Sequence, residues 1–445
     1  MKKSKNWRNF YKGWDIAMSE NVKLPDGWQK VKLSEIIEEV KERNITNNKE
    51  YPILTSSRKG IYIQEEYFNR VVASENLSNY KIIRKNEFTY RSMSDDQTFV
   101  FNRLELLEVG LVSPAYYVFK AKNSLSTFIK YFLNNSQEIK SQISKVIEGT
   151  TRTALRFNQV LKFVAMVPPL PEQRKIAEIL ETIDNAIEKT DAIIEKYKRI
   201  KQGLMQDLLT KGIDENWQIR NEKTHKFKDS LLGRIPEEWK VVKLKDVADI
   251  RLSNVDKKTD LKGKIIQLCN YLEVYQNDYI IKGMNFMHAS ATNNEIKKFK
   301  ISKGDVIITK DSEEYNDIAK PAYVRDEIEN LICGYHLALI KPLNNINGLF
   351  LSKVLSFRNV NIYFQQRANG ITRFGLTKET ITGAIIPLPL IPEQERIATI
   401  LSQIDEVIEK EQAYKEKLER IKKGLMEDLL TGKVRVNHLI EEEEK

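Results

Sequence analysis

The stretch PEQRKIAEILETIDNAIEKTDAIIEKYKRIKQGLMQDLLT, residues 171–210, decides the fold because the chain contains it twice. The second copy, PEQERIATILSQIDEVIEKEQAYKEKLERIKKGLMEDLLT, occupies residues 392–431, so every position recurs 221 residues later. Seven of the first ten residues and nine of the last eleven are identical in the two copies. Repetition at a fixed interval dictates the architecture, because both copies must adopt the same structure.

Both copies place apolar residues at the a and d positions of a heptad, which is typical of helices that pack side by side. A proline in the first turn and a glutamate after it favour a helix that begins at the proline. We therefore expect two helices of roughly 60 Å each. A core helix inside its own domain would give the same stripe, and this alternative stays open. The expected seam residues are Ile176, Leu180, Ile183, Ile187, Ile194, Leu204, Ile397, Leu401, Ile404, Ile408, Leu418 and Leu425.

A second repeated signal precedes each long helix. The run LPDGWQKVKL begins at Leu24 and IPEEWKVVKL begins at Ile235, so the prolines lie 211 residues apart and the second block holds ten more residues than the first. The ends of the blocks repeat while their interiors diverge. Within them, residues 109–119 predict a buried strand, and residues 126–146 and 348–367 show helical patterns.

The repeats predict a mixed α/β (α+β) chain with a pseudo-twofold internal repeat. Because a polar linker joins the end of the first helix to the second domain, we expect the helices to run antiparallel as a long two-helix coiled coil that separates the domains. The expected order is an N-terminal extension (1–24), domain one (25–170), helix one (171–210), a linker (211–234), domain two (235–391), helix two (392–431) and a C-terminal tail (432–445).

Composition narrows the function. The formal net charge is +10, which favours a polyanionic partner. The first residues lack the apolar run of a signal peptide, and two cysteines are too few for a disulfide framework, so we expect a cytoplasmic protein without a membrane segment. The sequence has no phosphate loop, no nucleophile elbow and no zinc motif, which favours a binding protein over an enzyme.

Basic residues near expected strand ends suit contacts with DNA phosphates or base edges. Two arginines recur in the setting G-x-T-R-x-x-L in both blocks. A solvated surface charge is the alternative for each residue. The candidate DNA-binding residues are Arg91, Ser92, Arg152, Lys310 and Arg373.

One pattern resembles the metal site of a nuclease. Pro25 and Asp26, followed by Glu39 and Lys41, spell PD…ExK, but the second block has Arg251 where the first has the lysine. We assign no catalytic residue and no metal ligand.

The repeated elements together resemble the specificity subunits of type I restriction–modification systems. They are IPEEW…VKL, G-x-T-R-x-x-L, then PLPEQ or PLIPEQ running into IA-x-IL and IK-x-GLM-x-DLLT, and they span most of the chain. Block one departs slightly, with LPDGW in place of IPEEW and VPPLPEQ at its close.

The resemblance implies two target recognition domains that each read one half of a split, asymmetric DNA sequence. It also implies helices that set the gap between half-sites and dock two methyltransferase (modification) subunits, which restriction endonuclease subunits then join. AdoMet, Mg²⁺ and ATP would bind those partners, and this chain would bind no cofactor. Two other functions remain as alternatives, a coiled-coil scaffold that binds only protein and a self-sufficient nuclease.

Overall fold

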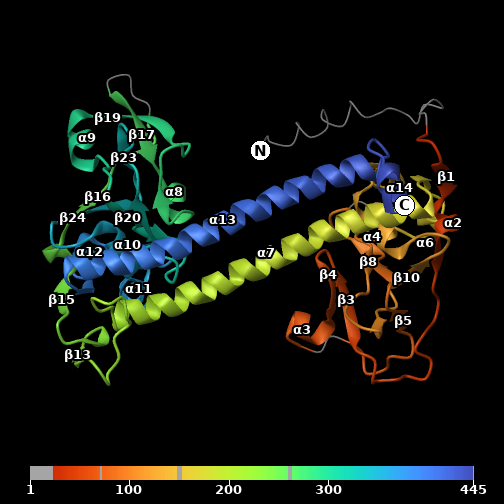
Figure 1. Ribbon diagram of the computed structural model, residues 1–445, viewed down its shortest axis with the longest axis horizontal. Coiled ribbons are helices and arrows are strands. Elements are labelled where there is room, and N and C mark those ends of the chain that lie inside the picture. The colour runs from red at the N-terminus through yellow and green to blue at the C-terminus, as the bar shows by residue number, and fades with distance from the viewer. Residues whose placement is uncertain (1–23, 71–72, 148–152, 259–262, 444–445) are drawn as a thin grey trace. The chain divides into compact units, whose positions relative to one another are not determined.

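The computed structural model describes residues 24–70, 73–147, 153–258 and 263–443 (Figure 1). Its contacts divide the chain into two compact units. Unit 1 comprises Met1–Thr190 and Tyr414–Lys445, and unit 2 comprises Asp191–Ala413. Helix α7 (Leu170–Thr210) begins in unit 1 and ends in unit 2, whereas α13 (Ile391–Leu429) begins in unit 2 and ends in unit 1. Each unit therefore holds the start of one long helix and the end of the other.

Unit 1 contains a four-stranded sheet in the order β2-β10-β6-β8 and a second one in the order β4-β3-β9-β5. Unit 1 also contains two short two-stranded sheets, β1-β12 and β11-β7. Its strands are β1 (Gln29–Lys32), β2 (Ile37–Glu39), β3 (Ile53–Ser57), β4 (Gly60–Ile63), β5 (Lys81–Arg84), β6 (Phe88–Arg91), β7 (Met93–Ser94), β8 (Asn102–Arg103), β9 (Val109–Val112), β10 (Tyr116–Ala121), β11 (Thr153–Ala154) and β12 (Val164–Val167). Its shorter helices are α2 (Leu33–Ile36), α3 (Gln64–Phe68), α4 (Ser126–Asn135), α5 (Gln137–Val146), α6 (Phe157–Val160) and α14 (Asn437–Glu443).

Unit 2 repeats this plan with sheets in the orders β16-β24-β20-β22-β18 and β19-β17-β23, and with the pairs β15-β26, β21-β25 and β13-β14. Its strands are β13 (Phe227–Ser230), β14 (Gly233–Pro236), β15 (Lys240–Lys243), β16 (Ala248–Leu252), β17 (Lys264–Cys269), β18 (Tyr279–Ile280), β19 (Met287–Ala291), β20 (Val306–Thr309), β21 (Asp311–Ser312), β22 (Pro321–Val324), β23 (Leu331–Cys333), β24 (Leu337–Pro342), β25 (Phe374–Gly375) and β26 (Ile385–Leu388). Its helices are η2 (Leu244–Asp246), α8 (Tyr271–Tyr275), α9 (Asn293–Phe299), α10 (Gly348–Ser356), α11 (Arg358–Gln365) and α12 (Lys378–Thr382).

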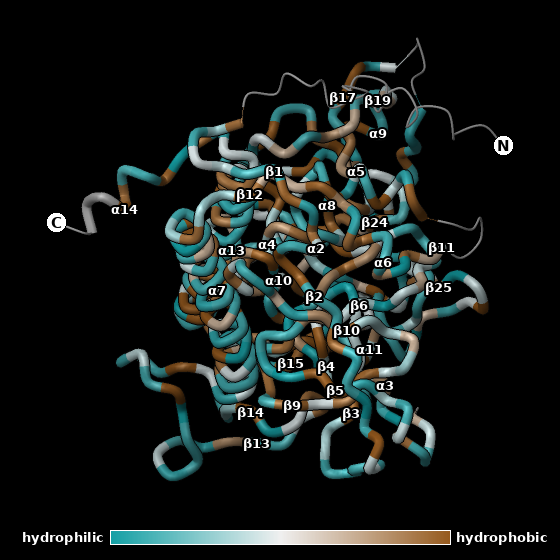
Figure 2. Tube along the Cα trace, turned by 90° about the vertical axis from the view of Figure 1, so that its right-hand side faces the viewer, coloured by the Kyte–Doolittle hydropathy of each residue, from teal (hydrophilic) through white to brown (hydrophobic). Residues whose placement is uncertain are grey.

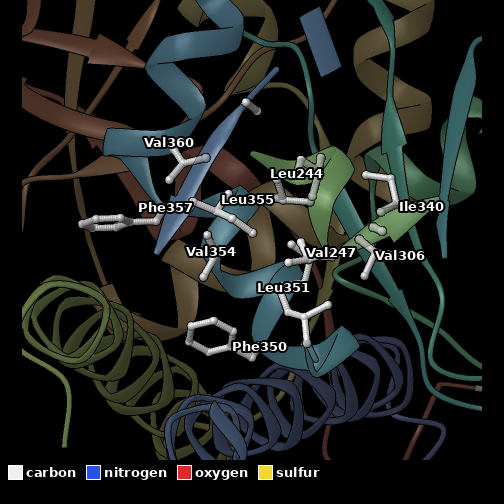
Figure 3. Close-up of a cluster of buried hydrophobic side chains, with 14 of the residues drawn as sticks. Leu244, Val247, Val306, Ile340, Phe350, Leu351, Val354, Leu355, Phe357 and Val360 are labelled. Carbon is white, nitrogen blue, oxygen red and sulfur yellow. The ribbon is translucent and has the colours of Figure 1, made fainter. Parts of the chain in front are cut away.

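The ends of the long helices belong to the domain cores. In unit 1, Ile176 and Leu180 of α7 share a buried cluster with Leu429 of α13 and the domain. In unit 2, Ile397 and Leu401 pack in the same way with residues near the end of α7. Figure 3 shows the side chains of α10 that face the long helices in this core. At each end of the long helices, the apolar stripe packs into the core of a domain. The alternative interpretation of the stripe, a helix in the core of its own domain, is therefore correct for the helix ends.

Further along the helices, the stripe alternates with hydrophilic residues, which Figure 2 shows as brown among teal on α7 and α13. Of the remaining seam residues, Ile194, Ile408 and Leu418 are buried, and Ile183, Ile187, Ile404, Leu204 and Leu425 are half-buried. None of the helices in the described ranges is long and apolar enough to cross a membrane.

Three expectations about secondary structure were too simple. The predicted helix over 126–146 is broken at Ser136, whose side chain accepts a hydrogen bond from the Ile139 N–H as the cap of α5. The pattern over 348–367 is likewise divided into α10 and α11 at Phe357. The predicted strand over 109–119 is two strands, β9 and β10, which lie in different sheets. The pattern of apolar residues cannot reveal a break between two helices when both helices bury the same face.

The linker over 211–234 also contains more structure than its polar composition indicates. It includes β13 and the first half of β14, which pair as an antiparallel hairpin. Ile213 and Arg220 within it are buried. Part of the linker is therefore a component of unit 2.

Candidate nucleic-acid interface

A hairpin in unit 2 carries Arg373 to the surface. The backbone groups of Asn369 and Gly375 exchange hydrogen bonds of 3.0 and 2.8 Å, which closes the loop between them. Gly370 adopts φ +145°, and a Cβ atom there would collide with the Arg373 carbonyl. The glycine of G-x-T-R therefore permits the tight reversal, and Arg373 and Ile371 are exposed at its tip.

This hairpin lies beside Lys310. Strand β25 pairs with β21, and the Leu376 N–H donates to the Lys310 carbonyl at 2.8 Å. Leu376, the last residue of the motif, is buried and anchors the loop. The ammonium of Lys310 is 2.7 Å from a carboxylate oxygen of Asp311, and its side chain is only 13% exposed. The hairpin that carries Arg373 is thus attached at Lys310 through Leu376, and the Lys310 ammonium is engaged within the protein.

Unit 1 builds the same junction from different residues. Strand β7 pairs with β11, and the Leu155 N–H donates to the Ser92 carbonyl at 2.9 Å, as Leu376 does to Lys310. The Ser92 hydroxyl donates to the Ala115 carbonyl at 2.7 Å. Arg91 is exposed at the end of β6. Arg152 lies outside the described residues.

The structure therefore places Arg91 and Ser92 of unit 1 and Lys310 of unit 2 at equivalent strand ends, and Arg373 in the hairpin that is attached to Lys310 through Leu376. Assignment of DNA contacts to these residues stays a prediction. Sequence reasoning missed Asp311 and His336, which hold Lys310. His336 lies in the loop between β23 and β24. The sequence feature that could have indicated this loop is Gly334, which interrupts the apolar run LICGYHLALI.

The repeated tryptophans and glutamates form one framework. In unit 1 the Trp28 indole N–H donates to Glu172 at 3.0 Å, and Arg435 donates to both oxygens of the same carboxylate at 2.8 and 3.0 Å. In unit 2 the Trp239 indole donates to Glu393 at 3.0 Å, and Arg220 binds both carboxylate oxygens. Each arginine follows the end of the other long helix. The triads therefore tie the start of one helix to the end of its partner.

The glutamine after each glutamate attaches the domain to its helix. The Gln173 side chain accepts hydrogen bonds from the Ser124 hydroxyl and the Leu125 N–H at 2.6 and 2.9 Å, just before α4. The Gln394 side chain accepts one from the Asn347 N–H at 2.8 Å, just before α10. The repeated PEQ motif is thus a joint, and its function is structural.

Two aspartates separated by the repeat interval link the helices to each other and to the domains. Asp184 accepts a hydrogen bond from the Tyr131 hydroxyl at 2.7 Å and lies 2.5 Å from the Lys422 ammonium. These side chains come from α4, α7 and α13 within unit 1. Burial raises the pKa of Tyr131, and the hydrogen bond to Asp184 raises it further.

Asp405 in unit 2 makes the equivalent contacts with Tyr279 at 2.7 Å and Lys201 at 2.6 Å. It also pairs with Lys353 of α10 at 2.5 Å. Burial would raise the pKa of Asp405, but the two lysines outweigh it and hold that pKa below its ordinary value. Asp184 with Lys422 and Asp405 with Lys201 give the same antiparallel register in both units.

The nuclease pattern gains no support from the geometry. Lys41 is exposed, and its ammonium lies 3.5 Å from a carboxylate oxygen of the half-buried Glu39 in a simple ion pair. Across the part of the chain that the structure describes, no group of three or more candidate ligands is placed to hold a metal ion.

Comparisons with known proteins agree with this architecture. The family described as "Type I restriction modification DNA specificity domain" matches residues 25–198 and 236–420. The chain is 26% identical to the type I restriction enzyme MjaVIII specificity subunit of Methanocaldococcus jannaschii, over 97% of this chain and 98% of the relative. It is also 26% identical to the putative MjaX specificity subunit of that organism, over 96% and 98%. A crystal structure of a type I restriction–modification S subunit from M. genitalium superposes with a TM-score of 0.56 at 14% identity, covering 93% of this chain and 98% of the other.

Proposed function

The chain belongs to the type I restriction–modification DNA specificity family, and from this premise we propose how its two units recognise DNA. As a specificity subunit it serves the recognition of DNA and acts with the other subunits of its system, without being the catalytic component. We propose that each unit reads one half of a bipartite, asymmetric target. The scaffold and nuclease alternatives have no support among the relatives, which are specificity subunits.

One observation carries the proposal for two half-sites. The Trp–Glu–Arg triads and the PEQ joints are equivalent in the two units, whereas the residues at the equivalent strand ends differ. Arg91 and Ser92 stand in unit 1 where Thr309 and Lys310 stand in unit 2. The two units thus share their supporting contacts but differ in the residues at the strand ends. This combination suits a protein that binds DNA at two places and recognises a different sequence at each.

We further propose that the paired helices fix the gap between the half-sites. The equivalent ion pairs of Asp184 and Asp405 support this role, because they oppose sliding of one helix along the other. The repeated helix surfaces would give two equivalent positions for two methyltransferase subunits, and restriction subunits would join them. AdoMet, Mg²⁺ and ATP would bind to those partners.

A binding experiment on the reconstituted complex tests the proposal. The complex with methyltransferase subunits should shift DNA that carries its target in the presence of excess unrelated DNA. Affinity should fall with salt, by a logarithmic slope of about 0.9 for each phosphate contacted. A complex without sequence preference would refute the proposal, and binding that salt does not affect would refute phosphate contact.

A further inference from the structure

The loop between β23 and β24 in unit 2 presents a histidine in an uncommon backbone conformation. His336 has φ +72°, in the left-handed region that side chains other than glycine rarely adopt. Its carbonyl accepts a hydrogen bond from the Lys310 N–H at 3.0 Å, and the preceding Tyr335 N–H donates to the Val255 carbonyl at 2.8 Å. Such conformations are strained, persist where neighbours enforce them, and cluster at functional sites.

The imidazole of His336 is held through its Nδ1 atom by Asp311. Its Nδ1 lies 2.5 Å from Oδ2 of Asp311, and the Lys310 ammonium lies 2.7 Å from the same oxygen. The Tyr335 ring centroid is 4.2 Å from that of His336, and the Lys310 ammonium is 4.9 Å from the Tyr335 ring. The ring therefore has a fixed position.

Asp311 determines which nitrogen carries the proton. Burial would raise the pKa of Asp311, but hydrogen bonds from Lys310 and His336 hold that pKa below its ordinary value. The ionised carboxylate can only accept a hydrogen bond, so Nδ1 of His336 is the protonated nitrogen. In the neutral ring, Nε2 is then a hydrogen-bond acceptor. No hydrogen bond joins Nε2 to any residue in the described ranges, and the side chain is 28% exposed.

Unit 1 has no such pair at the equivalent place. The register of β6 with β10 and of β20 with β24 makes Ala115 equivalent to His336, and Met93 equivalent to Asp311. The carbonyl at this position is bonded differently in the two units: the Ser92 hydroxyl donates to that of Ala115, whereas the Lys310 backbone N–H donates to that of His336. The two units therefore differ at this place in side chains and also in backbone, because His336 has φ +72° and Ala115 does not have a positive φ.

We propose that His336 reads a base in the half-site bound by unit 2, accepting at Nε2 a hydrogen bond from the exocyclic amino group of adenine or cytosine in the major groove. Asp311 is the positioning residue that fixes the ring and its tautomer. The inference rests on the function proposed above, and adds to it a specificity-determining side chain.

The test is a comparison of methylated motifs made by the assembled complex in cells. His336→Gly removes the ring and accepts the left-handed backbone without strain, so the loop is preserved. This variant should lose on the order of tenfold in preference at one base of one half-site, and leave the other half-site and the gap unchanged. Asp311→Asn should relax the same base, and the double variant should relax it no further. His225→Ala, in the linker of unit 2, is the control and should keep the wild-type motif.

The outcomes separate the two proposals. If the wild-type complex methylates a bipartite motif and His336→Gly keeps every base preference, the role of His336 is refuted while the proposed function stands. A uniform loss of methylation at all sites, with normal assembly, would also refute base reading by His336. If the wild-type complex shows no motif at all, the proposed function fails and the role of His336 fails with it.

Discussion

At the scale of single residues, the repeated motifs are explained by contacts that the sequence separates widely. Glu393 accepts hydrogen bonds from Trp239 and the Ile213 N–H, at 3.0 and 2.9 Å, and binds Arg220. Its side chain is 5% exposed and that of Arg220 is 9% exposed. The glutamate could be placed from the sequence, because it follows a helix-starting proline twice. Arg220 could not, because it is one arginine in a polar segment and its partner lies 173 residues away.

Removal of this carboxylate should leave buried Arg220 with only the exposed Glu238 as a counter-charge, and should leave the Trp239 and Ile213 N–H groups without their acceptor. Glu393→Ala should therefore lower the free energy of unfolding by about 3–5 kcal/mol. Glu395→Ala, on the exposed face of the same helical turn, should change it by no more than about 0.5 kcal/mol. Thermal or denaturant unfolding of both variants measures this difference, and equal effects would show that the triad does not stabilise unit 2.

At the scale of elements, each long helix is fastened by an aspartate at the same repeat position, but the two environments differ. Asp405 is 5% exposed and contacts two lysines, whereas Asp184 is 30% exposed and contacts one. The heptad pattern predicted the helices and their pairing. It did not predict these polar contacts, because an aspartate beside an a/d stripe is compatible with solvent exposure. The breaks at Ser136 and Phe357 escaped prediction for the same reason, since the apolar face continues through them.

Asp405→Asn should be strongly destabilising at neutral pH, by about 3–5 kcal/mol, because it leaves buried Lys353 without a carboxylate and Lys201 with only Asp278. Asp184→Asn, the matched variant, should cost about 1 kcal/mol or less. The pKa of Asp405 is lowered on folding. Its contribution is therefore complete above about pH 4, the ordinary range of an aspartate, and is lost as the pH falls below that value.

Unfolding experiments between neutral pH and pH 3 check this prediction. The difference in stability between the wild type and Asp405→Asn should shrink as the medium becomes acidic. A difference that stays constant with pH would mean that the carboxylate charge is not what stabilises this contact.

At the scale of the whole molecule, the internal repeat was the part most open to prediction. The fold class follows from two matched long helices, two repeated domain frames and a polar linker, and it is confirmed. The interiors of the blocks were much less predictable, since their short strands pair across long stretches of chain, as β3 does with β9 and β17 with β23. The positions of the residues at the candidate interface depend on those strand pairings. For that reason the sequence indicated Arg373 through its repeated motif, but gave no indication of the pair formed by Asp311 and His336.

The repeat also permits an exchange of one interior for the other. The interiors begin and end at equivalent joints, where the Leu33 N–H donates to the Phe163 carbonyl and the Leu244 N–H donates to the Ala384 carbonyl, both at 2.8 Å. Replacement of residues 244–384 by residues 33–163 should give two units that read the same half-site. The methylated motif should then become two inverted copies of one half-site, with the original gap. Retention of the original second half-site would contradict the assignment of reading to the interiors.

The most direct test of the central claim is to express the wild-type chain with a cognate methyltransferase subunit and to sequence the methylated positions across the host genome. The account predicts one bipartite motif, with two different half-sites at a fixed gap and modified bases on both strands. Random or absent methylation, in spite of a stable complex between the subunits, would contradict it and would favour a scaffold that binds only protein.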